Sequence, residues 1–155
     1  MADYPVTLSK TRISTLSNQE RLKGFTHRFK VKYSDVAVAS ATANADTVTV
    51  TLGTTPTRFS INAAQAVVTT AFAGTTALTM QVGITSNTDS CIVDTTVKTA
   101  GPICGLSNAV AAASKGSAAS DIVAVFTNAT GGSPSAISAG EVDIYLAIQN
   151  LDQLG

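Results

Sequence analysis

The sequence predicts an all-β protein, an antiparallel β-sandwich of about eight strands, with a jelly roll as the preferred arrangement. Apolar and polar residues alternate along short runs, which is the period of a strand buried on one face. Turn-like stretches rich in Gly, Pro, Ser and Asn separate these runs. Hydrophobic residues make up 45% of the chain, but only 5% are aromatic and 13% charged. This mixture, rich in Ala, Val and Thr, suits pleated surfaces better than helices. Two packed four-stranded sheets would accommodate eight strands.

The first predicted strand covers residues 25–33, where an aromatic and apolar set alternates with a polar and basic set. The first set is Phe25, His27, Phe29, Val31 and Tyr33, and the second is Thr26, Arg28, Lys30 and Lys32. We expect the first set to face the interior and the second to face solvent. Residues 36–39 are expected to continue this strand.

Seven further runs predict the remaining strands. They cover residues 47–52, 58–63, 66–72, 78–84, 92–98, 122–127 and 141–148. In the last run Val142 and Ile144 lie on one face, while Glu141, Asp143 and Tyr145 lie on the other. Residues 105–120 are rich in Ala, Ser and Gly and predict a long surface loop with one helical turn.

Charge divides the chain into two parts, although the net charge is zero. Residues 1–32 carry seven basic and two acidic side chains, and residues 33–155 carry three basic and eight acidic ones. We therefore predict an extended basic N-terminal arm over residues 1–24 and a β-sandwich body over residues 25–155. Such an arm is typical of a segment that binds an acidic partner. A solvated basic segment without a partner is the alternative.

The residues offer little support for catalysis, so we do not expect an enzyme. The only histidine, His27, is expected to pack on the aromatic face of its strand, and no Gly-x-Ser-x-Gly nucleophile motif occurs. Glu141 and Asp143 lie about 7 Å apart along one strand face, a spacing that would suit glycoside hydrolysis. Acids on the outer face of the last strand are common, however, and the chain contains no Trp.

Metal, nucleotide and cofactor binding are not expected either. Asp89, in a polar turn near Asp94, is the strongest calcium candidate, but calcium usually takes more carboxylates. Cys91, Cys104 and His27 are too few for a zinc site, and whether the two cysteines pair is left open. No phosphate-binding loop occurs, and no run approaches the roughly 18 apolar residues of a membrane helix. Nucleic acid is not an expected partner, because the aromatic residues alternate with the basic ones and face away from them.

In its order of elements, the sequence resembles the small head decoration (cement) proteins of tailed phages. The resemblance covers residues 25–150 and depends on the run Leu78–Ile84, the polar turn through Asp89, the strand to Lys98 and the segment Ala139–Leu146. It implies a jelly-roll body, a homotrimer, and a position on the outer capsid surface where the protein clamps major capsid subunits. The basic segment would then be the docking element, with the candidate residues Leu16, Arg21, Leu22, Lys23, Arg28, Lys30 and Lys32.

Two alternatives remain open at this point. The chain could be another virion component, such as a tail or head-fibre protein or a coat subunit. It could also be a carbohydrate-binding β-sandwich module, for which Tyr4, Tyr145 and Phe72 are the candidate exposed aromatic residues.

Overall fold

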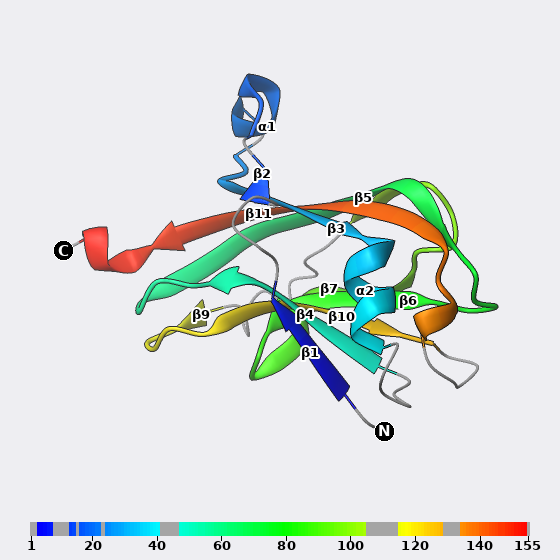
Figure 1. The fold of residues 1–155 in the computed structure, drawn as a ribbon. Helices are drawn as coiled ribbons and strands as arrows, with labels where there is room; N and C mark the ends of the chain where they lie inside the picture. The colour runs from blue at the N-terminus through cyan, green and yellow to red at the C-terminus, as the bar shows by residue number, and fades with distance from the viewer. Residues whose placement is uncertain are drawn as a thin grey trace.

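The computed structural model describes residues 3–7, 13–14, 16–22, 24–40, 47–104, 115–128 and 134–154, which form two packed β-sheets (Figure 1). The five-stranded sheet has the order β1 (Asp3–Thr7), β4 (Thr47–Thr54), β10 (Asp121–Thr127), β6 (Thr79–Ile84) and β7 (Asn87–Thr96). The six-stranded sheet contains β2 (Ile13–Ser14), β3 (His27–Lys32), β11 (Ala139–Asn150), β5 (Phe59–Ala73) and β8 (Gly101–Cys104), with β9 (Lys115–Gly116) also paired to β5. The prediction of an all-β sandwich is confirmed.

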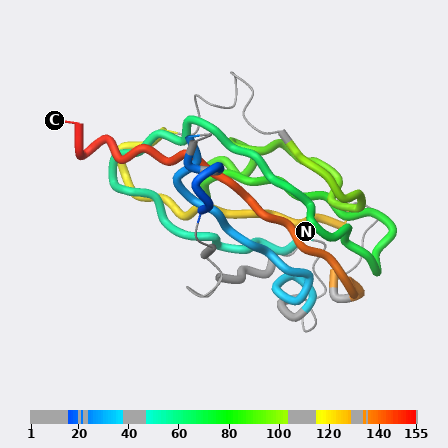
Figure 2. The backbone as a smooth tube through the Cα atoms, turned by 90° about the horizontal axis from the view of Figure 1, so that it is seen from above, coloured from blue at the N-terminus to red at the C-terminus, as the bar shows by residue number. Residues whose placement is uncertain are grey.

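The strand order is compatible with a jelly roll. Along the chain, β3, β5, β8 and β11 enter one sheet, while β4, β6, β7 and β10 enter the other. The last two long strands, β10 and β11, lie at the centres of their sheets. Seen from above, β11 runs between β3 and β5 (Figure 2). The ladders are antiparallel except for β1, which pairs with β4 in parallel.

The continuation of the first strand over residues 36–39 is wrong, because these residues lie in helix α2 (Tyr33–Ser40). The backbone N–H of Lys32 donates a hydrogen bond to Asp35 Oδ2 at 2.8 Å. Lys32 is the capping residue just before the helix, and Asp35 is the third helical residue. A bond from the N–H of the cap to the side chain of the third residue is one half of a capping box. The Val-Ala-Val-Ala pattern that suggested a strand also suits a helix, since Ala is the strongest helix former. Val36 is fully buried on this helix.

Two of the predicted strands form a single strand in the structure, and other predicted boundaries differ from the observed ones. Residues 58–63 and 66–72 belong to the continuous strand β5, which pairs with β11 and has register shifts along the way. The predicted turn around Asp89 is part of β7, which begins at Asn87. The short strand β8 was not predicted. Residues 105–114 of the predicted loop lie outside the described residues, and its next two residues form β9.

The prediction of an extended arm over residues 1–24 needs correction for its described stretches. Strand β1 is paired with β4, and β2 is paired with Phe29 and Arg28 of β3. Residues Asn18–Leu22 form the short helix α1, which stands away from the sandwich beside the six-stranded sheet (Figure 1). The segment is therefore partly integrated into both sheets. The domain boundary after residue 24 stays a prediction.

The core lies between the sheets and is built from the apolar set of each strand. Its largest fully buried side chains include Phe59, Phe72 and Phe126, and the rings of Phe72 and Phe126 lie 5.6 Å apart. In β3 the expected alternation holds for Phe29 and Val31, which are buried. It does not hold for His27, which is exposed at the start of the strand.

Two short 3-10 turns complete the described chain. The first, η2 (Pro134–Ala136), precedes β11, and the second, η3 (Leu151–Leu154), follows it. The longest helix in the described ranges has eight residues, and none is long and apolar enough to cross a membrane.

Candidate functional site: the charged outer face of β3 and β11

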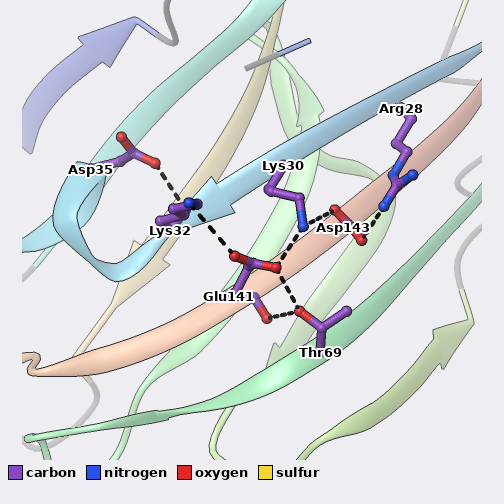
Figure 3. A network of polar contacts seen from close by, with 7 residues as sticks. All are labelled: Arg28, Lys30, Lys32, Asp35, Thr69, Glu141 and Asp143. Carbon is purple, nitrogen blue, oxygen red and sulfur yellow. Dashed lines mark hydrogen bonds and ion pairs between the residues drawn. The ribbon is translucent and has the colours of Figure 1, made fainter. Parts of the chain in front are cut away.

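Seven polar residues form a connected network on the outer face of the six-stranded sheet (Figure 3). The register between β3 and β11 produces it, because Lys30 lies opposite Asp143 and Lys32 lies opposite Glu141. Side chains on one face of paired strands come within contact distance across the ladder. We call this set the outer-face network: Arg28, Lys30, Lys32, Asp35, Thr69, Glu141 and Asp143.

Asp143 is the buried centre of the outer-face network. Its residue exposure is only 2%, although it lies on the outer face of the sheet. Its Oδ2 accepts a hydrogen bond from an Arg28 guanidinium nitrogen at 2.8 Å, and its Oδ1 lies 3.4 Å from Lys30 Nζ. A buried carboxylate is costly unless it is paired. The two cations supply that pairing.

Glu141 joins the other side of the network. Lys30 Nζ donates to its Oε1 at 2.5 Å, and Thr69 Oγ1 donates to the same oxygen at 3.1 Å. Lys32 Nζ lies 4.0 Å from Oε2. The hydrogen bond with Lys30 lowers the pKa of Glu141, and the same bond raises the pKa of Lys30. Both groups are therefore held in their charged forms.

Aromatic rings flank the network at its Arg28 end. The guanidinium carbon of Arg28 lies 5.6 Å from the ring centroid of Tyr145, a cation–π distance. The Tyr145 ring lies 5.6 Å from that of Phe25. The Arg28 side chain is thus held between a carboxylate and an aromatic face.

Chemically, this arrangement neutralises charge and couples strands. The three cations of the network pair with Glu141 and Asp143, while Asp35 accepts a hydrogen bond from the backbone N–H of Lys32. Glu141 is held ionised by Lys30, so it is not a ready proton donor of the kind that a glycosidase pair requires. The geometry therefore gives no support to the Glu141–Asp143 hydrolase interpretation.

Among the residues that the structure describes, it brings together three of the seven predicted docking residues. Arg28, Lys30 and Lys32 are in the outer-face network, where acids of the same chain face them. Arg21 is exposed in the last turn of α1, and Leu16 is half-buried just before this helix. Leu22 lies in α1, but its side chain is outside the described residues, as is all of Lys23.

The acidic partners were the part of the site that the sequence interpretation missed. Glu141 and Asp143 were correctly expected to share a face. The signal that could have paired them with the basic set was their matching alternation, three basic residues in one strand and two acidic residues in another. Thr69 carried no such signal.

Among the described residues, no group of three His, Cys, Asp or Glu side chains could hold a metal ion. Asp89 and Asp94 are exposed on β7. Cys91 is buried, and its pairing with Cys104 stays open because the Cys104 side chain lies outside the described residues. Phe72 is buried, which corrects its assignment as an exposed aromatic residue.

The fold as a whole is similar to a chain in the capsid of Ralstonia phage GP4. The TM-score is 0.54 at 13% sequence identity, over 96% of this chain and 99% of that chain. A second structure is PliG of Aeromonas hydrophila, a periplasmic inhibitor of g-type lysozyme. It matches at 11% identity over 96% of this chain and 100% of that one, with a TM-score of 0.34 that is too low to indicate a shared fold.

No protein-family model matches this sequence, and no curated protein matches it significantly. At 13% identity, the likeness to the capsid chain concerns the fold. The chain is thus a β-sandwich whose fold is similar to that of this capsid chain.

Proposed function

We propose that this protein is a non-enzymatic structural component of a tailed-phage virion that docks on the outer capsid surface and cements neighbouring major capsid subunits. The observation that carries the proposal is the likeness to a phage capsid chain over almost the full length of both chains. The order of sequence elements that resembles head decoration proteins supports the same function.

The N-terminal segment is the docking element in this proposal, with its contact centred on α1. This helix stands away from the sandwich (Figure 1), and Arg21 is exposed on it. By contrast, Arg28 and Lys30 are engaged by Asp143 and Glu141. Their charge is largely neutralised within the chain, so they stabilise the platform from which α1 extends.

Self-association into a trimer would make such docking firm. A single surface ion pair contributes only about 0–1 kcal/mol. Several copies of the same weak contact, linked in one assembly, raise the overall attachment through effective concentration. Homo-oligomers are usually closed and symmetric.

Location in the particle tests the proposal most directly. Tailed-phage particles from the source of this sequence are analysed by mass spectrometry and imaged by cryo-electron microscopy. The proposal expects density for this fold on the outer surface of the shell. Absence from the particles would overturn it. Density in the tail or fibres would replace capsid docking with the other virion assignment.

A charge-reversal pair tests the docking element. We expect Arg21→Glu to reduce co-sedimentation with capsids, whereas Lys115→Glu, an equally simple reversal at an exposed site, leaves it unchanged. Deleting residues 1–24 is a poorer test, because it removes β1 from the five-stranded sheet. Attachment through charge should weaken as ionic strength rises. Unchanged binding of Arg21→Glu would overturn the assignment of α1.

A further inference from the structure

An apolar cavity opens between the two sheets at the end where β4 and β11 finish. Its volume is about 580 Å³, within the range of ligand-sized pockets. Three of its lining side chains, Phe29, Ile122 and Ile148, are buried at 9% exposure or less. Gly53 leaves space beside them, because a Cβ added there would lie 3.6 Å from the Phe29 ring in ordinary contact.

The lining of the cavity selects for an apolar occupant. Among the described residues that line it, there is no Lys, Arg, Asp or Glu. His27 lies at the cavity with its ring stacked on that of Phe29 at a centroid distance of 6.1 Å. Although His27 is exposed as a residue, partial desolvation of its ring at the cavity lowers its pKa, which favours the neutral imidazole. An apolar group that enters the cavity would therefore displace water from apolar surface and would not desolvate a charged side chain.

A projecting apolar side chain lies at the same end of the molecule. Asn150 lines the cavity, and η3 begins at the next residue. The chain after β11 extends beyond the end of the sandwich (Figures 1 and 2). Leu154 in η3 is 67% exposed, more than Tyr33 and Val93, the other exposed large hydrophobic residues in the part of the chain that the structure describes. Within its own chain, Leu154 does not fill the cavity.

We propose that η3 of one copy inserts Leu154 into the cavity of a second copy, so that this end of the sandwich is a self-association surface. The inference rests on the proposed function, in which copies of this chain assemble, and it names the contact. Each copy carries both the projection and the cavity, so identical copies can form a closed assembly in which every projection is received.

Light scattering during size-exclusion chromatography of the full chain, over a range of concentrations, tests this contact. We expect the wild-type chain to be oligomeric and Leu154→Lys to weaken association roughly 10- to 100-fold per contact, as expected for the burial of one leucine. Leu154→Met should retain association. Val93→Lys places the same charge on another exposed apolar residue, on β7, and should have no effect.

A second variant tests the cavity itself. Gly53→Leu places a side chain in the cavity from within and should reduce association while the folded monomer keeps or gains thermal stability. A monomeric wild-type chain, or an unchanged oligomer in Leu154→Lys, would overturn the inference. An equal loss in Val93→Lys would do the same. Co-sedimentation with capsids is measured separately, so attachment that survives in a monomeric Leu154→Lys would leave the proposed function standing.

Discussion

Replacing Asp143 with Asn tests whether the outer-face network stabilises the fold. The substitution keeps the side-chain volume and removes the charge. The carboxylate is 4% exposed and contacts Arg28 at 2.8 Å and Lys30 at 3.4 Å. In the variant these two cations remain next to each other, with an amide in place of the acid between them.

The expected loss of stability follows from these contacts. A hydrogen bond to a charged group is worth about 1.5–3 kcal/mol, and removing one partner of a buried pair costs about 3–5 kcal/mol. Arg28 and Lys30 are 24% and 27% exposed, so water offsets part of the loss. We therefore expect Asp143→Asn to lower the free energy of unfolding by about 2–3 kcal/mol. For a chain of this length that corresponds to a Tm about 5–10 °C lower.

Urea unfolding followed by circular dichroism measures this change, and the chain offers a matched control. Asp94 is an exposed acid on β7, so Asp94→Asn should stay within about 0.5 kcal/mol of wild type. A double-mutant cycle between Arg28 and Asp143 then isolates their coupling energy. An Asp143→Asn variant as stable as Asp94→Asn would refute the reasoning.

Two further predictions concern the same sheet. Gly140 has φ of 141°, and a Cβ there would lie 2.4 Å from the Phe72 ring, so Gly140→Ala should destabilise by about 2–4 kcal/mol in thermal unfolding. Gly24→Ala, at φ of 88° with open space around it, should cost less, and equal losses would contradict the packing explanation. Lys30 lowers the pKa of Glu141 below its ordinary 4.5, so this carboxylate stabilises the fold above that pH, and the stabilisation is lost as pH falls through the folded-state pKa. Tm measured against pH should therefore fall less steeply on acidification in Glu141→Gln, and identical slopes would count against the pairing.

Much of the strand content could be predicted because alternation is a local property of the chain. The predicted run 78–84 matches β6 (Thr79–Ile84) to within one residue, and residues 141–148 lie in β11; the apolar sets of both runs are buried. The failures occurred where local pattern is ambiguous. The Val-Ala-Val-Ala run at 36–39 is compatible with the period of a strand and with that of a helix. The helix α2 that contains it depends on the contact between Asp35 and Lys32 at its start. The pairing of β1 with β4 could not be expected from a polar segment with weak periodicity.

Only the outward orientation of the candidate site's charged residues could be predicted, because alternation is a local property of the chain. Alternation placed the basic set of β3 and the acidic set of β11 on outer faces, but it could not show that these faces are one face. The partners Arg28 and Asp143 are 115 residues apart in the chain. Without that pairing, the basic residues were interpreted as free docking charge.

By itself, the sequence determined which side chains point inward and which point outward within most strands, because successive residues of a strand face opposite sides. Only the tertiary structure decided which strands are neighbours. That choice placed Lys30 beside Glu141 and Asp143, and it brought Phe29, Ile122 and Ile148 together around the cavity. Pairing between distant strands depends on how all the apolar faces pack together, which no local stretch of sequence encodes.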